Sequence, residues 1–448
     1  MKGGKFLKKF TFSGGIHPLA RTHEGKAATA KSAVRPFVSD TVRIAMDMHI
    51  GAPSKPCVAK GDRVLLGQVI AEPVGPLGIP VHASVSGTVV DISPYQQLPA
   101  APSLCITIQN DFADEWAPLP AGLGNVETCD PAKIIPAIRE AGICGMGGAS
   151  FPTHVKLTIP EGKSIDTIIL NGAECETFLT ADDRLMIETP LRVVDGLRSV
   201  MRATGVQNGI IAIEDNKPAA IAAIRKAAAG RHGVRVAVLR TKYPQGGEKQ
   251  LIKAVTDREV PSGGLPMDAH VVVLNVATAA AIADAVIDGR PLIQRIVTVT
   301  GCVRKPSNLL LRIGTIFLDA IGACDGFSRE PGKILAGGSM VGLCAPSDTI
   351  ATIKGNNGIV ALDEQQSAAP TESACIRCGK CVRACPMRLN PYLLKNLCDA
   401  GRLEDARKNH IADCILCGSC SYACPARRWI MASIKNGKDT LAQQARRK

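Results

Sequence analysis

Two short cysteine runs near the C-terminal end carry the clearest chemistry in the sequence. Residues 375–386 read CIRCGKCVRACP and residues 414–425 read CILCGSCSYACP, so the second run repeats the first at an offset of 39 residues. Each run has the spacing C-x2-C-x2-C-x3-C-P, which is typical of bacterial domains that hold two [4Fe–4S] clusters. A zinc ribbon is the alternative, but zinc sites use cysteines in two pairs rather than in two runs of four. The spacing therefore predicts two [4Fe–4S] clusters.

In this spacing the first three cysteines of a run hold one cluster and the fourth holds the other. One cluster is expected on Cys375, Cys378, Cys381 and Cys424, and the second on Cys385, Cys414, Cys417 and Cys420. The other nine of the 17 cysteines, Cys398 among them, are single, and we expect them to be small buried hydrophobic residues. Two cross-ligated clusters form a short path for single electrons, so the rest of the chain should supply a source or a sink.

A second candidate site lies in the middle of the chain. A short amphipathic helix pattern with Pro131 near its start leads into a glycine-rich loop. The loop contains Gly142, Gly145, Gly147 and Gly148. Clustered glycines can offer backbone N–H groups to a phosphate, although a plain turn is the alternative reading. The loop is not the Rossmann fingerprint, because Ser150 stands where the last glycine would be.

The elements after this loop predict an α/β sheet. A buried-strand pattern at 165–170 ends in Asn171, with Glu174 and Glu176 just beyond it. Further strand patterns follow at 210–214 and 234–239, with an alanine-rich helix at 218–229, a glycine turn at 243–250, and a strand and helix at 271–286. This alternation is typical of βαβ units with a mostly parallel sheet. Open sheets of this kind bind ligands at the carboxyl ends of their strands, where these polar residues lie.

Four motifs in this region resemble one known family. GMGGASFPTHVK is similar to the flavin loop of the NADH-oxidising subunit of respiratory complex I, and NGAECE, YPQGGEKQ and NVAT are similar to three further motifs of that subunit, in the same order. GGIHP at 14–18 and the double cysteine run are absent from that subunit. With them, nearly the whole chain resembles the RnfC family, whose members are subunits of the Rnf ion-translocating oxidoreductase complexes.

The resemblance implies where a flavin and a nicotinamide would bind. FMN is expected at Gly145, Gly147, Gly148, Lys156, Asn171, Glu174, Tyr243, Gly246 and Asn275. NADH is expected to stack near Phe151, with Glu176 and Glu248 on its polar groups. The chain departs from the complex I pattern at Met146, Ala173, Thr177 and Gly247. No catalytic acid, base or nucleophile is expected from the protein, because the cofactors carry the chemistry.

The resemblance also implies a function. The chain is expected to be an NADH-dependent oxidoreductase subunit that passes electrons between NADH and ferredoxin, through FMN and two [4Fe–4S] clusters, within a complex that moves ions across a membrane. The expected partners are the other Rnf subunits, especially the iron–sulfur protein RnfB and the integral membrane subunits, with ferredoxin reached indirectly. One alternative is a soluble flavin and iron–sulfur reductase such as a microcompartment cobalamin reductase. The other is a non-enzymatic electron-carrier scaffold with an empty nucleotide fold, which the departures at Met146, Ala173 and Gly247 leave open.

These patterns predict a multidomain α/β chain. Its expected segments are a basic N-terminal segment with GGIHP at 1–34, a barrel-sandwich β domain of biotinyl/lipoyl type at 35–112, a Rossmann-like α/β flavin domain at 125–287, a β-grasp module at 288–345, a helical ferredoxin-type domain for two [4Fe–4S] clusters at 365–430, and a basic tail at 431–448. The barrel-sandwich domain lacks the hairpin lysine motif that carries a cofactor, so it is expected to be structural. We expect a structural role for His17 of GGIHP as well.

Charge is concentrated at the two ends of the chain. The net charge is +13, with +7 in residues 1–35 and +9 in residues 371–448. Such ends favour docking onto a partner or an anionic surface. Nucleic acid is not expected as a partner, because only 3% of the residues are aromatic and no reading motif accompanies the charge. No apolar run approaches the roughly 20 residues of a membrane span, so we expect any membrane association to be peripheral. The resemblance implies a place on the cytoplasmic face of the bacterial inner membrane.

Overall fold

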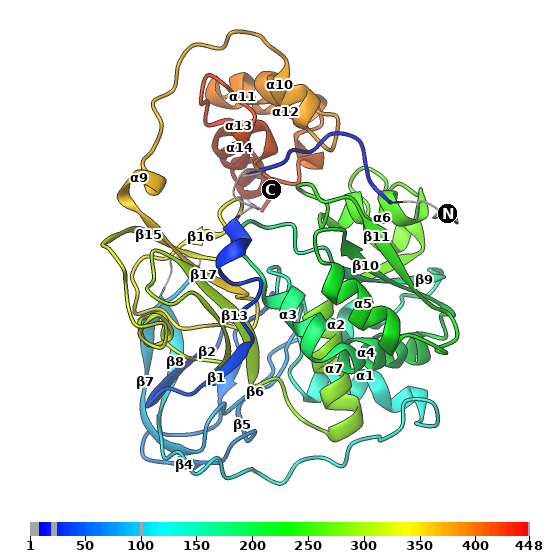
Figure 1. Cartoon of the computed structure of the whole chain (residues 1–448), viewed down its shortest axis with the longest axis vertical. Helices are drawn as coiled ribbons and strands as arrows, with labels where there is room; N and C mark the ends of the chain where they lie inside the picture. The colour runs from blue at the N-terminus through cyan, green and yellow to red at the C-terminus, as the bar shows by residue number, and fades with distance from the viewer. Residues whose placement is uncertain (1–8, 19–24, 99–101, 447–448) are drawn as a thin grey trace, which may run out of the picture.

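The computed structural model describes residues 9–18, 25–98 and 102–446 (Figure 1). Within these ranges the strands form four sheets. The chain is a multidomain α/β protein, and its C-terminal helices, orange and red in Figure 1, lie together at one end of the molecule. None of the helices in the described ranges is both long and apolar enough to cross a membrane.

The middle of the chain forms a parallel four-stranded sheet in the order β11-β10-β9-β12. Its strands are β9 (Thr167–Gly172), β10 (Asn208–Glu214), β11 (Val234–Leu239) and β12 (Val271–Asn275). Its helices are α1 (Pro131–Glu140), α2 (Thr153–Leu157), α3 (Ala181–Glu188), α4 (Pro190–Thr204), α5 (Pro218–Ala227), α6 (Glu248–Thr256), the short η2 (Pro266–Ala269) and α7 (Val276–Asp288). The alternation of strands and helices confirms the βαβ prediction, and β9 runs two residues later than the expected 165–170.

Alternate residues of the sheet pack into two separate cores, as the pleat requires. Ile168 and Leu170 pack with buried residues of α1, α4, α5 and α7. Ile169 packs on the opposite face with Leu251 and Ile252 of α6. The sheet is therefore covered on both faces, which explains why its strands read as nearly continuous apolar runs.

An all-β domain precedes this sheet. It pairs β2 (Thr41–Ala45), β8 (Pro102–Asn110), β7 (Gly87–Gln96) and β4 (Arg63–Val64) in one sheet, and β3 (Lys55–Pro56), β5 (Val69–Glu72) and β6 (Val81–His82) in another. Their apolar side chains share one core, in which Val42, Ile44 and Ile106 are fully buried. The two facing sheets fit the barrel-sandwich expectation.

A six-stranded sheet follows, in the order β1-β14-β13-β17-β15-β16. Its elements are β1 (Val34–Phe37), β13 (Gln294–Gly301), β14 (Ser307–Arg312), α8 (Phe317–Gly322), β15 (Pro331–Ala336), β16 (Leu343–Cys344) and β17 (Gly358–Asp363), with α9 (Glu364–Ser367) after it. Strand β1 pairs in parallel with β14, and β17 pairs with β13 and β15. The sheet thus includes strands that the expected segments 35–112 and 288–345 do not assign to it, because pairing across some 270 residues leaves no local signal.

The C-terminal domain repeats its backbone as well as its sequence. It contains α10 (Lys380–Ala384), α11 (Pro391–Asp399), α12 (Leu403–Lys408), the short η3 (Ile411–Asp413), α13 (Ser419–Tyr422) and α14 (Ile430–Arg446). Arg377 and Leu416 share a left-handed φ near +55°, and Gly379 and Gly418 share one of +70° or more. These pairs are 39 residues apart, so both cysteine runs wind through the same tight turns.

Two expectations about the basic ends need correction. Residues 431–446 belong to helix α14 rather than to a separate tail, because Ile430 and Ile434 pack into the core of the cysteine domain. In the N-terminal segment, Lys26 is 7% exposed and donates to the carbonyls of Glu174, Glu176 and Leu179. Lys26 is therefore a structural residue and adds nothing to a docking surface. Residues 1–8 and 19–24 of this segment lie outside the described ranges.

Candidate functional site

The parallel sheet reverses its strand order at β9, and two asparagines end the strands at that point. Strand β9 lies between β10 and β12, and Asn171 of β9 is in register with Asn275 of β12. The crevice outside such a reversal is where open α/β sheets bind nucleotides. Asn275 also caps α7, since its side chain accepts from the N–H of Ala277 at 2.8 Å.

The glycine-rich loop lies beside Asn275. A Cβ on Gly147 would come within 3.2 Å of the Asn275 Cβ, and Gly148 has φ +117° with open space around it. The N–H of Gly145 donates to the carbonyl of Phe151 at 2.8 Å, which closes the loop on itself. A hollow opens beside the loop, lined by Gly147, Gly148, Ser150 and Glu176 and, from the loop between β15 and β16, by Gly337 and Gly338. The hollow and the close backbone approach fit a phosphate or a flavin ring edge.

Lys156 and Glu248 meet across this edge of the sheet. The Lys156 ammonium donates to Glu248 Oε1 at 2.9 Å and to the carbonyl of Val273 in β12 at 2.8 Å. Glu248 is the first residue of α6, where the helix dipole favours a negative charge. The side chains of Lys156 and Glu248 are 29% and 40% exposed, so a ligand can reach both.

Acidic side chains gather on the other side of Asn275. The Glu174 carboxylate accepts from the N–H groups of Asp182 and Asp183 at the start of α3, at 2.7 and 3.2 Å. Asp182 Oδ2 accepts from the Asn275 amide at 2.7 Å. Burial and the nearby Glu174 carboxylate raise the pKa of Asp182 to about 7 and that of Asp183 to about 6. The sequence prediction named Glu174 here but missed both aspartates, which follow it within ten residues.

Glu176 connects the segment after β9 to the loop between β15 and β16. Its carboxylate accepts from the N–H groups of Met340 and Val341, at 3.2 and 3.0 Å. Burial raises its pKa, and these two hydrogen bonds oppose the rise. Gly338 is required at this contact, because a Cβ there would lie 2.1 Å from Glu176 Oε2.

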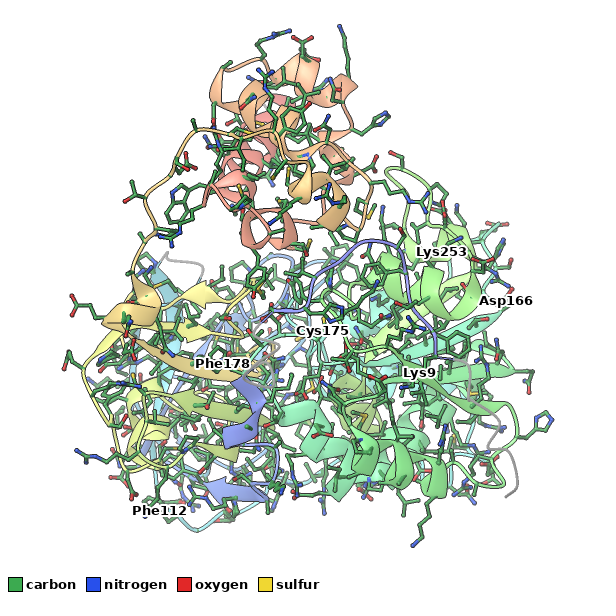
Figure 2. The ribbon with its side chains drawn as sticks, turned by 45° about the horizontal axis from the view of Figure 1, so that its top comes forward. Lys9, Phe112, Asp166, Cys175, Phe178 and Lys253 are labelled. Carbon is green, nitrogen blue, oxygen red and sulfur yellow. The ribbon has the colours of Figure 1, made fainter. Side chains whose placement is uncertain are left out.

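The turn after β11 completes the site. Asn171 donates from its amide to the carbonyl of Gly246 at 2.8 Å, and the N–H of Gly246 donates to Cys175 Sγ at 3.2 Å. Figure 2 shows Cys175 near the middle of the molecule. Gln245 is fully buried, and neither its amide oxygen nor its amide nitrogen has a hydrogen-bond partner. A buried polar side chain without a hydrogen-bond partner needs an explanation, and a polar cofactor bound at this turn would supply the partners. The sequence prediction passed over Gln245, although it lies inside the YPQGGEKQ motif.

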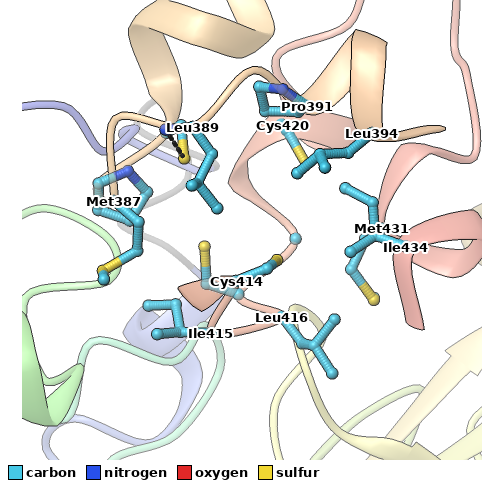
Figure 3. Close-up of a pocket in the computed structure, with 14 residues that line it drawn as sticks. Met387, Leu389, Pro391, Leu394, Cys414, Ile415, Leu416, Cys420, Met431 and Ile434 are labelled. Atoms are coloured by element: carbon cyan, nitrogen blue, oxygen red, sulfur yellow. Dashed lines mark hydrogen bonds between the residues drawn. The ribbon is translucent and has the colours of Figure 1, made fainter. Parts of the chain in front are cut away.

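The second set of expected cluster cysteines surrounds one hollow. Cys385, Cys414, Cys417 and Cys420 line it together with apolar side chains that include Leu389, Leu394 and Ile434 (Figure 3). The N–H of Leu389 donates to Cys385 Sγ at 3.4 Å. Burial, and then the nearby sulfurs of Cys414, Cys417 and Cys385, raise the pKa of Cys420 to about 12. Four thiolates in an apolar hollow need a cationic core between them, and an iron–sulfur cube supplies one. We call these four residues the inner cysteines.

The first expected set lies farther out and is called the outer cysteines. Cys424 is close enough to Cys381 to raise the pKa of that thiol, although burial raises it more. Cys375 is exposed and Ile376 is 67% exposed, whereas Cys381 is buried. The fold thus brings Cys424 of the second run toward the first and Cys385 of the first run into the second, as cross-ligation requires. Within the described residues no three His, Cys, Asp or Glu side chains meet around the position of a single metal ion.

The inner cysteines lie near Tyr243, in the turn after β11, and near α6. Burial raises the pKa of the Tyr243 hydroxyl, and Glu176 and the sulfurs of Cys175 and Cys417 raise it further. The Gln250 amide donates to Met387 Sδ at 3.0 Å, two residues after Cys385. Tyr243 therefore lies within electrostatic reach of both sites.

Several single residues differ from expectation. Of the nine single cysteines, Cys105, Cys129, Cys144, Cys302 and Cys324 are buried, whereas Cys175 and Cys398 are partly exposed and Cys57 and Cys344 are exposed. The expectation of burial is therefore wrong for Cys57 and Cys344, which lie on short edge strands or beside them. The His17 side chain is exposed.

Family models match successive parts of the chain. Residues 10–113 match the RnfC barrel sandwich hybrid domain, 138–284 the Nuo51 FMN-binding domain, 296–343 the SLBB domain, and 369–425 the 4Fe-4S dicluster domain. The chain thus combines a flavin-binding domain with a domain for two [4Fe–4S] clusters.

Similar proteins cover the chain from end to end. The C subunit of the Na(+)-translocating ferredoxin:NAD(+) oxidoreductase complex of Acetobacterium woodii is 45% identical over 98% of this chain and 99% of its own length. The chain belongs to the RnfC family. Its relative from the proton-translocating ferredoxin:NAD(+) oxidoreductase complex of Clostridium ljungdahlii is 46% identical over 89% of this chain and 87% of its own length. A solved NAD+-reducing [NiFe]-hydrogenase in its H2-reduced state aligns with 71% of this RnfC-family chain and 62% of the hydrogenase chain, with 18% identity and a TM-score of 0.48.

Proposed function

We propose that this chain is the NADH-oxidising subunit of an Rnf-type ferredoxin:NAD+ oxidoreductase complex, in which electron transfer is coupled to ion translocation. The observation that carries the proposal is the end-to-end identity to RnfC relatives from complexes with that activity. The cofactors are FMN, two [4Fe–4S] clusters and NAD(H) as substrate. When bound, FMN exchanges a hydride with NAD(H) and single electrons with clusters.

The protein's part is to hold and orient these groups. We assign the FMN site to the glycine loop at Gly145, Gly147 and Gly148, to Lys156, Asn171, Glu174 and Asn275 at the strand ends, and to Tyr243 and Gly246 in the turn. Phe151, Glu176 and Glu248 are assigned to NADH. The hollow supports the part of this assignment at Gly147, Gly148 and Glu176, which line it, and the buried unpartnered amide of Gln245 supports the part in the turn. Gln245 is added to the FMN site on that basis.

We assign one [4Fe–4S] cluster to the inner cysteines and the other to the outer cysteines. The apolar hollow around the inner set supports its assignment. We propose that the chain is divided into a basic N-terminal segment, a barrel-sandwich domain, a Rossmann-like flavin domain, a β-grasp module and a ferredoxin-type domain. The β-grasp sheet then includes β1 and β17.

The other subunits of the complex are the partners of this chain. We propose that electrons pass at the outer cysteines to the iron–sulfur protein RnfB or to the integral subunits, with ferredoxin reached through them. Exposed Cys375 and Ile376 support an exchange at this end. The cytoplasmic face of the inner membrane is the proposed location.

Anaerobic purification tests this function. The protein should retain FMN and about eight iron atoms, as two [4Fe–4S] clusters require, and NADH should reduce both the FMN and the clusters. Iron without FMN or NADH oxidation would instead support the electron-carrier scaffold. A protein that holds FMN and oxidises NADH, but binds a corrinoid enzyme and no Rnf subunit, would support the cobalamin reductase.

A further inference from the structure

The N-terminal GGIHP motif lies between the two cofactor domains. We call residues 10–16 the strap. The N–H of Phe10 donates to the carbonyl of Val238 in β11, and Ile16 pairs with Tyr243 through two hydrogen bonds of 2.8 Å. Between these points the N–H of Gly15 donates to the carbonyl of Ala384 at 3.0 Å. Figure 1 shows this blue segment passing beneath the orange and red helices.

Glycine is required at both central positions of the strap. Gly14 has φ +82°, and a Cβ there would lie 2.8 Å from the carbonyl oxygen of Cys385. Gly15 has φ +84°, and a Cβ there would lie 2.7 Å from the carbonyl oxygen of Tyr243. Left-handed backbone disfavours any side chain. The space disfavours one too, because the nearest atom that a Cβ would meet at each position is a backbone carbonyl oxygen, which cannot move aside cheaply.

Lys242 binds the strap through hydrogen bonds and a ring contact. Its ammonium donates to the carbonyls of Phe12 and Gly14, the latter at 2.9 Å, and it lies 3.8 Å from the centre of the Phe12 ring. The strap therefore contacts both cofactor domains. The strap contacts the backbone of Cys385, one of the inner cysteines, and it pairs with Tyr243, which the proposed FMN site contains.

We propose that the strap is a positioning element, in which Gly14 and Gly15 fix the inner cysteines against the Tyr243 turn. Electron exchange between the FMN site and the inner cluster then depends on residues that bind neither group. This inference rests on the proposed function for its cofactors, but the contacts belong to the chain itself. Single-electron transfer slows as the distance between the two groups grows, and a Cβ at either glycine would force the backbone carbonyl of Cys385 or of Tyr243 to move.

The test compares Gly15→Ala with wild type and with Gly75→Ala as a matched control. Gly75 also has a left-handed φ, +70°, but open space around it, and it lies in the barrel-sandwich domain. Each anaerobic protein is mixed with one equivalent of NADH, which becomes NAD+ and H+ and gives up two electrons, one to each cluster. Cluster bleaching is followed in time, and ferricyanide reduction by NADH is measured separately, because that small oxidant can take electrons at the flavin.

Gly15→Ala should keep wild-type FMN, iron and ferricyanide reduction, while NADH reduces its clusters severalfold more slowly than those of wild type. Dithionite should still reduce the clusters completely, and Gly75→Ala should match wild type in every assay. Amide exchange gives a readout without turnover: Gly15 and Ile16 should be protected in wild type and exposed in the variant.

Lys242→Met is the second variant, since it removes two strap hydrogen bonds and adds no atom near a cysteine. If Gly15→Ala loses FMN and iron together and has therefore misfolded, Lys242→Met tests the positioning role of the strap in its place. Cluster reduction at the wild-type rate in Lys242→Met, with its strap amides exchanging freely, would overturn the proposal. Wild-type protein without FMN or ferricyanide reduction would refute the proposed function instead. Unprotected Gly15 and Ile16 amides in that protein would refute the strap as well.

Discussion

Lys156 Nζ lies 2.9 Å from Glu248 Oε1 and holds the start of α6 against the end of β12 through its second bond, to the Val273 carbonyl. This pair spans the edge of the sheet where the proposed FMN and NADH sites meet. A partly exposed ion pair contributes about 1 kcal/mol or less to the free energy of unfolding. Its loss should therefore affect ligand binding more than folding.

The first prediction is that Lys156→Met lowers FMN occupancy while iron content stays at the wild-type value. The reason is that the substitution removes a cation from the FMN site and leaves the cysteine domain untouched. FMN and iron are measured per chain after anaerobic purification. Lys163→Met is the matched control, because Lys163 also pairs with an acid, Asp268 at 2.6 Å, but away from the site. Equal loss of FMN and iron would indicate misfolding and contradict the assignment.

The second prediction separates the two clusters. Cys385→Ala should remove the cluster of Cys414, Cys417 and Cys420, although Cys385 belongs to the other run. The remaining cluster should keep about half of the iron and its own electron paramagnetic resonance signal. Cys398→Ala is the control, since Cys398 Sγ packs against Gly437 and lines neither set. A Cys385→Ala protein that instead loses the cluster of Cys375, Cys378 and Cys381 would show that the ligand sets are wrong.

Local patterns were enough to predict the elements that are contiguous in sequence. The 39-residue offset was visible in the sequence, and the structure shows it again in the paired turns at Gly379 and Gly418. The strand pattern placed Asn171 at a strand's carboxyl end, whereas Asn275 was named only through the family resemblance, and the structure puts it in register with Asn171. The pairing of β1 with β14 was not predictable, because strand partners far apart in sequence leave no periodic signal. Asp182 and Gln245 were missed for a related reason. Each stands out as a candidate site residue only because its side chain is buried, and burial of a polar residue cannot be predicted from a sequence motif.

The third prediction concerns pH. The folded-state pKa of Asp182 is about 7, above the value of an exposed aspartate, because burial and Glu174 oppose its charge. Its contribution to stability is therefore fully present below about pH 4 and is lost as the pH rises through 7. Asp182→Asn, which cannot ionise, should gain melting temperature relative to wild type at pH 8 but not at pH 4. At pH 8 the free energy of unfolding of the variant should exceed that of wild type by a few kcal/mol, as an order of magnitude.

Asp166→Asn is the control for this pH effect. The hydrogen bond from Arg258 lowers the pKa of Asp166, so its contribution has the opposite sign and is lost as the pH falls. The Asp166 side chain is 54% exposed, which keeps its effect small. Equal pH profiles for wild type and Asp182→Asn would mean that Asp182 is not the titrating group.

The last prediction concerns membrane association. Basic residues beside the outer cysteines are exposed, namely Arg377, Lys380 and Arg383, and so is Arg388 beside Cys385. By contrast, Lys26 is buried and Lys9 pairs with Asp215 at 2.8 Å. Among these described residues, the exposed basic charge therefore lies on the C-terminal domain. Each basic residue near an anionic surface contributes about 1 kcal/mol, and about 1 M salt shortens the screening length to about 3 Å.

Association that is purely electrostatic should therefore be lost in about 1 M salt, whereas a shape-specific interface with partner subunits should partly survive. We expect the protein to fractionate with membranes at low salt and to stay partly bound at high salt where its integral partners are present. On membranes without those partners it should be released, because none of its described helices can span a bilayer. The measurement is the fraction of protein in the membrane pellet at each salt concentration. Retention on partner-free membranes at high salt would contradict the prediction, since charge alone could not hold the protein there.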